Sequence, residues 1–573
     1  MKILSLHTDY IKFKPLKKAL KSVDPLSEEE KKEKHVPEAL TIMTAIEKQD
    51  EGNIKKVVEA LVEEIIKIAE QVNVKNIVLY PYAHLSSNLA SPEYALQALI
   101  ETEKALSKKY KVWRAPFGYY KEFEMKVKGH PLSELSREIR IDDKDKNKVE
   151  VEEKVDYRNL LSQISKSKLD NSKLKENDHR ILGQQMDLFS FNEVAPGMVF
   201  WHNNGLIIYN ELINYWREEH RKAGYQEIKT PQIMDSKLWK ISGHWDKYKE
   251  NNFTTEYEKR PFLVKPMNCP GGMLVYKATP KSYKDLPLRV GEVGIVHRQE
   301  LSGVLSGLFR VVQFTQDDAH IFCAEEQLEN EILAIIKLID IFYNKFNLEF
   351  DHVELSTRPE KRIGSDKMWD KAERILEDVL KKNKMKYKIN KGDGAFYGPK
   401  IDFHVKDSQG RTWQVSTIQL DFSMPERFDL EYTDKDNSKK QPSMIHRVIY
   451  GSLERFIGIL LEHTNGRLPT WLAPKQVRVL NFTDRNTRYS NKIIEKLKSE
   501  IPELRIDSDF KQTTIPSKVK EAEIQRIPYI IVLGDNEEKE NSVALRVRGN
   551  SKIIKKSVDE FIKELKLEIK ERR

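Results

Sequence analysis

The stretch that decides the fold is FTQDDAHIF at residues 314–322, which is preceded by VGIVHRQE at residues 293–300. Side chains two positions apart on a strand share one of its faces. If residues 310–322 are extended, one face carries an aromatic ring, an amide, a carboxyl group and an imidazole: Phe314, Gln316, Asp318 and His320. The turn-rich residues 301–307 separate the two runs, which predicts an antiparallel hairpin. A solvated sheet face is the alternative interpretation of this polar spacing.

The first run of the hairpin repeats the pattern, because Arg298 and Glu300 are also two positions apart. We therefore expect one surface to present an arginine, two acids, an amide and an imidazole. Upstream, KPMNCPGG at residues 265–272 contains Cys269, and Cys323 is the only other cysteine. Two cysteines exclude a disulfide framework, and a lone cysteine is commonly a buried, unreactive thiol.

Length and composition set wider limits on the chain. Its 573 residues predict about three or four domains, and 39% hydrophobic residues are enough to form buried cores. A net charge of +9 permits a nucleic-acid partner without requiring one. The sequence has neither an apolar run of about 18 residues nor a signal-peptide pattern, so we expect a cytoplasmic protein with no membrane contact.

Residues 1–140 predict a compact α/β unit. Apolar positions from Ile54 to Val72 follow helical spacing between two β-prone runs. Three polar and aromatic clusters stand where predicted strands end, and pockets are often built at such places. They are YPYAHLSS at 80–87, APFGYYK at 115–121 and GHPLSELSR at 129–137. Ordinary turns are the alternative for any one of them.

A charged linker is predicted at residues 141–177, followed by a second domain at 178–474 and a third at 475–573. In the second domain, residues 205–223 predict a helix that stops at Gly224. Residues 450–463 predict another helix, with Arg455 off its apolar stripe. Arg455 is positioned either to meet a phosphate at the helix start or to lie in solvent. Short strands alternating with helices predict a small open α/β third domain.

Taken together, these motifs resemble the class II threonyl-tRNA synthetases. The helix at 205–223 with its following strand is similar to motif 1, the dimer interface of class II enzymes, while the hairpin resembles motif 2 and residues 450–463 resemble motif 3. From Asp178 onward the core resembles the bacterial type. Residues 1–140 instead resemble the archaeal-type editing domain, which is similar to D-aminoacyl-tRNA deacylases. The last domain resembles the anticodon-binding domain shared by threonyl-, prolyl-, histidyl- and glycyl-tRNA synthetases.

The resemblance implies a fold and an activity. The fold is multidomain, with a deacylase-like α/β editing domain, an antiparallel-sheet catalytic domain and a small α/β anticodon-binding domain. The activity is ATP-dependent activation of L-threonine, its transfer to threonine tRNA, and hydrolysis of mischarged seryl-tRNA, by a homodimer. ATP brings Mg²⁺, whose ligands the sequence does not identify. A hydroxyl-binding metal rejects valine, but serine differs from threonine by one methyl group, worth only about 1–3 kcal/mol, so an editing domain is required.

Each implied role falls on numbered residues of this sequence. The zinc ligands, one ion per subunit, are Cys269, His320 and His446, whose thiolate and two imidazoles leave one tetrahedral position open. The residues implied for ATP are Arg298, Glu300, Arg310, Phe314, Gln414 and Arg455. Those implied for threonine are Met267, Gln316, Asp318, Tyr397 and Gln419. His244 and Lys400 join Arg298 and Arg455 as catalytic residues. Editing falls to His84, Tyr120, Lys121 and Glu134, and anticodon contact to Arg546, Arg548, Glu537 and Asn481.

The sequence departs from the family pattern at three positions, and two rival functions remain open. Gly272 stands where the family commonly has His, and Leu301 and Ser306 stand where Pro and His are expected, which affects the acceptor contacts rather than the ligands. A seryl- or prolyl-tRNA synthetase would share the scaffold but would not need the Cys–His–His trio. A non-catalytic paralogue that binds tRNA or its own message would not need Arg298, Glu300 and Arg455.

Overall fold

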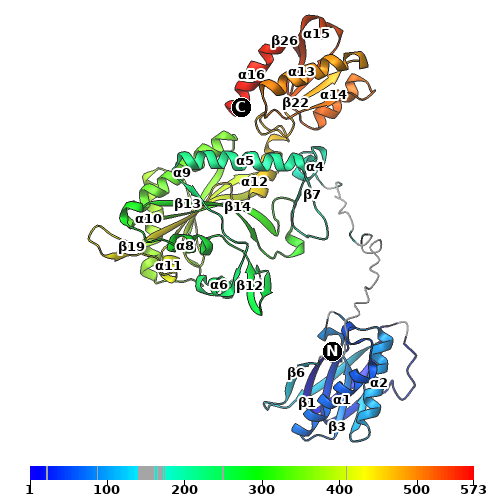
Figure 1. The fold of residues 1–573 in the computed structure, drawn as a ribbon. Helices are drawn as coiled ribbons and strands as arrows, with labels where there is room; N and C mark the ends of the chain where they lie inside the picture. Colours follow the sequence, from blue (N-terminus) through cyan, green and yellow to red (C-terminus); the bar gives the residue numbers. More distant parts are fainter. Residues whose placement is uncertain are drawn as a thin grey trace. The chain divides into compact units, whose positions relative to one another are not determined.

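The computed structural model divides the chain into two units, Met1–Val155 and Asp156–Arg573 (Figure 1). The structure describes residues 1–20, 23–86, 88–139, 161, 164, 172, 174–247, 251–407 and 409–573. Most of the predicted linker at 141–177 therefore lies outside the described residues. Within the described ranges, no helix is long and apolar enough to cross a membrane.

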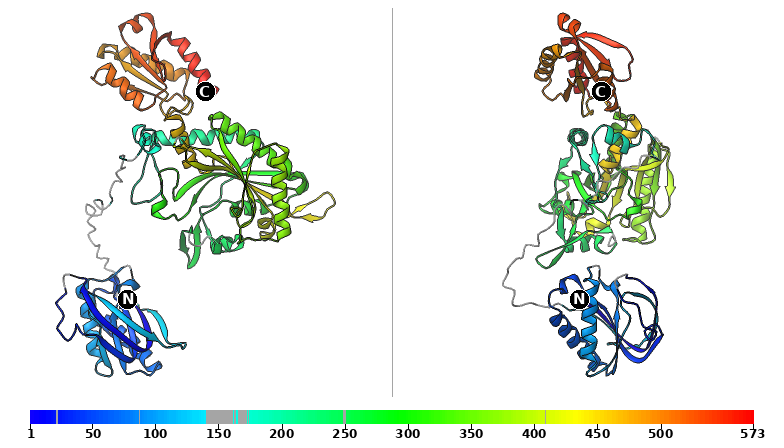
Figure 2. Two further views of the ribbon diagram at one scale, coloured as in Figure 1. Left: turned by 180° about the vertical axis from the view of Figure 1, so that it is seen from behind. Right: turned by 90° about the vertical axis from the view of Figure 1, so that its right-hand side faces the viewer.

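The first unit is a six-stranded sheet in the order β4-β3-β2-β1-β5, with β6 also paired to β1. Its elements are β1 (Lys2–Lys18), β2 (Lys34–Ala45), α1 (Ile54–Gln71), β3 (Asn76–Pro81), α2 (Pro92–Leu106), β4 (Lys111–Arg114), β5 (Tyr119–Val127) and β6 (Glu134–Glu138). The helix predicted from its spacing is α1, and Leu61 and Ile65 on its apolar stripe pack with Leu40 and Ile77 of the sheet. Figures 1 and 2 show α1 and α2 against one face of this sheet.

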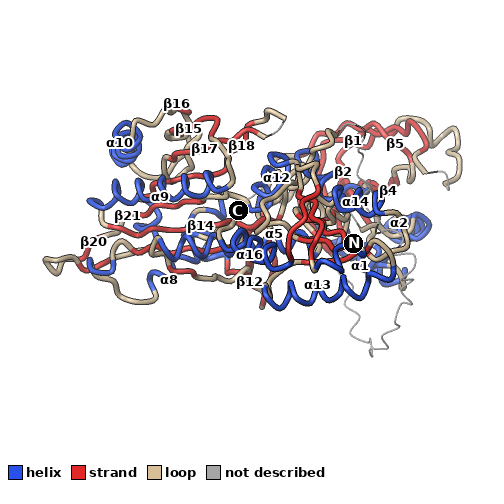
Figure 3. The backbone as a smooth tube through the Cα atoms, turned by 90° about the horizontal axis from the view of Figure 1, so that it is seen from above, coloured by secondary structure: helices blue, strands red, loops and turns tan. Residues whose placement is uncertain are grey.

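An eight-stranded, largely antiparallel sheet organises the second unit, in the order β16-β15-β17-β18-β21-β14-β13-β9. Its strands are β9 (Gln226–Glu227), β13 (Leu288–His297), β14 (Gln313–Cys323), β15 (Phe350–Ser356), β16 (Lys388–Asn390), β17 (Lys400–Lys406), β18 (Thr412–Asp421) and β21 (Ser443–Val448). Four helices supply one large core with it: α5 (Asn203–Lys222), α9 (Leu328–Lys345), α10 (Asp366–Lys382) and α12 (Leu453–Thr464). Figure 3 shows α9 and α10 alongside these strands. The apolar sides of β15, β17 and β18 face this core, so their polar sides are left for a site.

The predicted hairpin is formed by β13 and β14, with Val290 opposite His320 and Gly294 opposite Gln316. Its strands are shorter than expected. The first ends at His297, so Arg298 and Glu300 lie in the connecting loop rather than on a strand face. The loop turns away because the Gln299 N–H donates to the Asn251 carbonyl, 2.9 Å away, outside the sheet.

Smaller elements complete the core of the second unit. They are α4 (His179–Gln185), β7 (Phe189–Ser190), β8 (Phe200–Trp201), β10 (Ile233–Asp235), α6 (Ser236–Ser242), α7 (His244–Lys247), β11 (Thr254–Tyr257), β12 (Arg260–Val264), α8 (Cys269–Lys277), α11 (Ser423–Arg427), β19 (Tyr432–Thr433) and β20 (Lys439–Lys440). Among them, α8 carries the predicted cysteine at its first position. The predicted stripe of α5 is only partly buried, since Trp216 is enclosed while Leu206 remains 43% exposed.

The C-terminal region has its own five-stranded sheet, in the order β23-β22-β24-β25-β26. Its elements are β22 (Val477–Asn481), α13 (Thr487–Glu500), β23 (Ile506–Asp509), α14 (Ile515–Ile524), β24 (Tyr529–Leu533), α15 (Asp535–Glu540), β25 (Ser542–Val547), β26 (Ile553–Ser557) and α16 (Val558–Lys570). The predicted α/β alternation is therefore present. Strand β26, which the sequence analysis did not predict, reads IIKKS, and its two lysines weaken the apolar signal of an edge strand.

Candidate active site

A buried cluster of Cys269, His320 and His446 lies on the polar side of the eight-stranded sheet. His320 on β14 and His446 on β21 are cross-strand partners, with ring centroids 5.0 Å apart. Cys269 opens α8, and one ligand atom from each of the three residues lies within 4.8 Å of the others. The fold thus brings together three residues that are far apart in sequence.

The donor set of this cluster fits a divalent metal. Burial raises the pKa of the Cys269 thiol well above its usual range, and the Asp318 carboxylate adds to the shift. Burial lowers the pKa of His320 well below its usual range, with His446 adding to it. Among the described residues, His320 Nε2 is a buried atom without a hydrogen-bond partner. A zinc ion bound here would stabilise the thiolate and use the imidazole lone pair.

Asp421 is a neighbour of the cluster that the sequence analysis missed. Its Oδ2 lies 2.8 Å from His446 Nε2, and its side chain is fully buried. The missed signal was strand alternation, because Asp421 stands two positions after Gln419 on β18. Gly272 also lies beside the cluster, since a Cβ at this position would come 3.3 Å from His320 Nδ1.

The residues predicted to bind threonine surround the three ligands. Asn268 Nδ2 donates to Asp318 Oδ2 over 3.2 Å, and burial raises the pKa of Asp318. The Tyr397 ring lies 5.2 Å from the His446 ring. Gln419 is the register partner of His446 on the neighbouring strand. Gln316 shares the face of β14 that holds Asp318 and His320.

His244 and Met267 lie together at this site. His244 Nε2 is 2.8 Å from Met267 Sδ, and its Nδ1 is 2.8 Å from Ser242 Oγ. Burial and the positive charge of Arg298 lower the pKa of His244 to about 3. The imidazole is therefore neutral at physiological pH. The remaining catalytic prediction, Lys400, holds its Nζ 2.8 Å from Asp402 Oδ2 and 3.0 Å from Asp393 Oδ2.

Next to these residues is a cavity of about 210 Å³ that gathers five of the six residues predicted for ATP. Its lining is Arg298, Glu300, Phe309, Arg310, Val311, Phe314, Trp413, Ser452 and Arg455. Arg298 Cζ lies 5.2 Å from the Phe314 ring centroid, and Arg310 Nη2 pairs with Glu300 Oε2 at 2.8 Å. The sixth residue, Gln414, does not line the cavity, because its side chain donates to Asp402 Oδ1 and Thr417 Oγ1.

The Arg455 side chain is largely buried and held by hydrogen bonds rather than solvated. Its Nε donates to the Phe309 carbonyl over 2.9 Å and its Nη1 to the Gln414 carbonyl over 3.0 Å. Ser452 caps α12 by accepting the Arg455 N–H. Burial, with Arg310 and Arg298 adding to it, lowers the pKa of Arg455. Three guanidinium groups with one carboxylate among the lining residues favour a polyanionic ligand.

His179 holds the backbone of the segment that lines this cavity. No sequence pattern predicted this role. Its Nδ1 lies 2.8 Å from Glu462 Oε1, and its Nε2 accepts the Leu308 N–H over 3.0 Å. Gly307 adopts a φ of +51°, and a Cβ there would come 2.3 Å from His179 Nε2. His179 therefore fixes the backbone just before Phe309, whose carbonyl holds Arg455.

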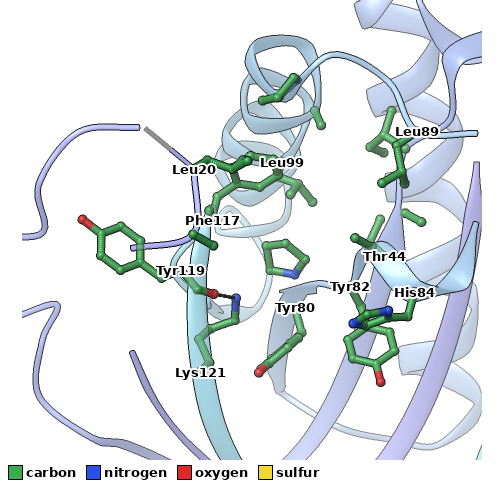
Figure 4. Close-up of a pocket in the computed structure, with 18 of the residues that line it drawn as sticks. Leu20, Thr44, Tyr80, Tyr82, His84, Leu89, Leu99, Phe117, Tyr119 and Lys121 are labelled. Atoms are coloured by element: carbon green, nitrogen blue, oxygen red, sulfur yellow. Dashed lines mark hydrogen bonds between the residues drawn. The ribbon is translucent and has the colours of Figure 1, made fainter. Parts of the chain in front are cut away.

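A second cavity, of about 540 Å³, lies in the first unit (Figure 4). His84, Tyr120 and Lys121 are among its lining residues, as predicted, together with Tyr80 and Phe117. Lys121 Nζ donates to the Pro116 and Tyr119 carbonyls over 2.9 and 3.0 Å, and it lies 5.1 Å from the Tyr80 ring centroid. Burial lowers the pKa of Lys121 to about 8.

Glu134 does not line this cavity, contrary to the prediction. It is exposed on β6, where it pairs with Leu6 of β1, whereas Lys121 pairs with Pro15 of the same strand. The nine residue steps from Leu6 to Pro15 span roughly 30 Å of extended chain. The pairing of β6 with the first residues of β1 is what separates Glu134 from Lys121.

The four residues predicted to contact an anticodon do not form one surface. Asn481 is buried, donates to the Thr483 carbonyl and accepts from Lys518 Nζ. Glu537 accepts the Gly534 N–H within its own helix cap. Arg546 lies on β25, but Arg548 does not share its strand face, because β25 ends at Val547. Arg548 instead donates to the Arg526 and Leu468 carbonyls.

Comparison with known families matches three separate segments of the chain. Residues 1–139 match the archaea-specific editing domain of threonyl-tRNA synthetase. Residues 253–464 match the class II tRNA synthetase core domain of the G, H, P, S and T type, and residues 476–568 match an anticodon-binding domain. The chain is thus a multidomain protein with an editing domain, a class II antiparallel-sheet core and an anticodon-binding domain.

Individual relatives agree with these matches. Two bacterial proteins named threonine–tRNA ligase are similar to 69% and 73% of this chain, at 54% and 52% identity, from Desulforamulus reducens and Carboxydothermus hydrogenoformans. The matched residues cover 62% and 64% of those proteins, so the chain spans less than two thirds of their length. A crystal structure of the RNA-binding domain of threonyl-tRNA synthetase from Cryptosporidium parvum matches 68% of this chain and 98% of its own, with 38% identity and a TM-score of 0.66.

Proposed function

Because this chain belongs to the threonyl-tRNA synthetase family, we propose that it is a threonine–tRNA ligase that also hydrolyses mischarged seryl-tRNA. Its substrates are ATP, L-threonine and threonine tRNA. The observation that carries the proposal is the adjacency of the buried Cys269–His320–His446 cluster and the arginine-lined cavity. One site suits an amino acid with a hydroxyl group, and the other suits a triphosphate.

In the activation step, the threonine carboxylate attacks the α-phosphorus of ATP and pyrophosphate leaves. Negative charge builds on the α-phosphate, and Arg298 is the residue that stabilises it there. Arg455, held by two backbone carbonyls, takes the γ-phosphate. Phe314 supplies a ring face for the adenine and Glu300 accepts from its amino group. Mg²⁺ arrives with ATP.

Selection of threonine is assigned to the residues around the trio. Zinc, when bound by Cys269, His320 and His446, supplies a Lewis-acidic position for the amino and hydroxyl groups of threonine. Asp318 and Gln316 orient the amino acid, with Met267, Tyr397 and Gln419 completing the pocket. Valine cannot supply the hydroxyl group, so its exclusion is strong, whereas serine is excluded only by one methyl group.

Transfer and editing use different residues. A neutral His244 is suited to accept a proton from the terminal ribose hydroxyl as that hydroxyl attacks the carbonyl carbon of threonyl-adenylate; the ester bond to tRNA forms and AMP leaves. We assign Lys400 as a further catalytic residue of the core. In the first unit, Lys121, Tyr120 and His84 line a cavity suited to the seryl ester of a tRNA terminus. We assign its hydrolysis to them.

The same proposal covers assembly and domain roles. We assign residues 1–140 to editing, 141–177 to a linker, 178–474 to synthesis and 475–573 to anticodon binding, with Arg546 and Glu537 as the available contacts. We assign a homodimer formed through α5, as the resemblance of this helix to motif 1 implies. We place the protein in the cytoplasm, where its substrates are found.

Threonine-dependent exchange between ATP and pyrophosphate tests the ligase proposal. We expect exchange with threonine, weaker exchange with serine and none with valine or proline. An Arg298→Ala variant should lose the activity, while Arg374→Ala, an exposed arginine on α10, should retain it. Exchange driven by serine or proline in preference to threonine would favour the rival synthetases. Absence of exchange with zinc present would favour a non-catalytic RNA-binding protein.

A further inference from the structure

A second group of metal-ligating side chains lies on the same polar face of the sheet, on β15 and β17 near the β16 edge. His352 and Glu354 are two positions apart on β15, so they share a face, and His404 on β17 is the register partner of His352. One ligand atom from each lies within 4.8 Å of the others. None of these residues belongs to the Cys269 cluster or to the arginine-lined cavity.

The two imidazoles lie beside the same carboxylate, that of Glu354. His352 Nε2 lies 3.1 Å from Glu354 Oε1, and His404 Nε2 lies 3.6 Å from Glu354 Oε2. The rings are stacked with centroids 4.4 Å apart and planes 8° from parallel. Both Nε2 atoms therefore point to the same region. A rotation of one ring about its Cβ–Cγ bond is needed before both lone pairs converge on a single ion.

Outer hydrogen bonds orient these ligands. His352 Nδ1 lies 2.6 Å from Asp351 Oδ2, a contact that keeps a proton on Nδ1. Its Nε2 is 3.1 Å from Glu354 Oε1, and a bound metal ion would replace the proton shared between these two atoms. Asn390 Nδ2 donates to Glu354 Oε2 over 2.9 Å and orients the carboxylate. Carboxylate–imidazole pairs of this kind are the usual outer support of metal-bound histidines. His404 Nε2 is a buried atom without a hydrogen-bond partner in the described part of the chain.

We propose that His352, His404 and Glu354 bind a divalent transition-metal ion of the zinc type, with water in the remaining position. Two imidazoles and a carboxylate suit zinc, cobalt and nickel better than magnesium or calcium. The side chains of His352, Glu354 and His404 are 18%, 19% and 16% exposed, so an ion can enter from solvent. The ion links β15 to β17 beside Asp402, the register partner of Glu354 and the residue that pairs with Lys400.

The test is zinc binding by the full chain, because this site has no thiolate and the Cys269 site has one. The chain carrying Cys269→Ala is stripped with a chelator and titrated with Zn²⁺ by calorimetry. We expect one equivalent to bind, and we expect Co²⁺ in the same variant to give a d–d spectrum without a thiolate charge-transfer band. Adding His352→Ala or Glu354→Gln should weaken Zn²⁺ binding at least 100-fold.

Two further variants separate a metal site from a plain hydrogen-bond network. Asp351→Asn should weaken Zn²⁺ binding by about 10- to 100-fold without removing a ligand. His35→Ala, an exposed histidine on β2, should leave binding unchanged. Glu354→Gln keeps the shape of the network, so its circular dichroism and metal-free melting temperature report whether the fold survives. The proposal is overturned if the Cys269→Ala chain binds no Zn²⁺, or if folded Glu354→Gln binds it as tightly as its parent.

Discussion

The arginine-lined cavity of the core and the cavity of the first unit recognise ligands by different physical means. The core cavity is about 210 Å³ and holds three guanidinium groups that a polyanion can neutralise. The cavity of the first unit is larger, about 540 Å³, and among its described lining residues Lys121 is the one lysine or arginine, beside the imidazole of His84. We expect the first to select its ligand by charge. We expect the second to select by shape, with one buried amine among its described lining residues.

This difference matches the two tasks that we propose. Synthesis requires strong stabilisation of developing phosphate charge, which buried cations provide without reorganisation. Editing must accept serine and exclude threonine, which differ by a methyl group, so a fitted apolar wall is the suitable device. Errors that the core cannot prevent are then corrected by a site that tests size rather than the hydroxyl group.

The strongest test of this contrast is Arg455→Ala. Loss of one cation at the developing charge should reduce threonine-dependent pyrophosphate exchange about 10²- to 10³-fold. Hydrolysis of seryl-tRNA by the same variant should be unchanged, because Arg455 does not line the first-unit cavity. Parallel exchange and deacylation assays measure both. A comparable fall in deacylation would show that the two sites are not independent.

Lys121→Met is the reciprocal test and has a smaller expected effect. Methionine keeps the length of the side chain but removes its charge, so deacylation of seryl-tRNA should fall about 10- to 100-fold. Threonine activation should be unaffected, and seryl-tRNA should accumulate when serine is supplied. Lys126→Met, an exposed lysine on the same strand, is the matched control. An unchanged deacylation rate would remove Lys121 from the editing site.

Much of the core site could be predicted because its signals are periodic. Alternation in FTQDDAHIF correctly gave the shared face of Gln316, Asp318 and His320 and the hairpin that carries it. The apolar stripe also predicted a helix over residues 450–463, and the structure has α12 at Leu453–Thr464, beginning after the Ser452 cap. Resemblance to a family then supplied Cys269 and His446, which no spacing rule connects.

The parts that could not be predicted depend on single contacts between distant segments. His179 and Glu462 are 283 residues apart, and no pattern marks a one-to-one contact of that kind. Glu134 failed for a related reason, since its residue type matched the family but the pairing of β6 with the start of β1 fixes its position. Arg548 lies one residue beyond the end of β25, so the two-residue spacing that would put it on the strand face of Arg546 does not apply there.

The pH dependence of editing sharpens the role of Lys121. Burial lowers its pKa to about 8, so the amine is protonated below that pH and neutral above it. If the protonated amine stabilises the ester oxygen, the enzymatic deacylation rate should be flat below about pH 8 and fall up to tenfold per pH unit above it. Lys121→Arg stays charged and should lose this inflection. Rates are corrected for uncatalysed ester hydrolysis, and a rise through pH 8 would instead identify the neutral amine as a base.

The smallest expected effect concerns how the core cavity is held. His179→Phe fills the space of the imidazole but cannot accept the Leu308 N–H or bond to Glu462 through the ring, so the Leu308 N–H loses its acceptor and Glu462 loses one of its partners. We expect a loss of roughly 1–3 kcal/mol in the free energy of unfolding. We also expect a higher KM for ATP with little change in kcat, because Phe309 no longer presents its carbonyl to Arg455 in a fixed position. Chemical denaturation and steady-state exchange measure the two effects, and Tyr110→Phe, a substitution in the first unit, is the control. A variant with reduced stability but an unchanged KM for ATP would mean that His179 stabilises the fold without positioning the cavity. The contrast between a rigid cation-lined site and a fitted apolar site would then depend on Arg455 and its neighbours alone.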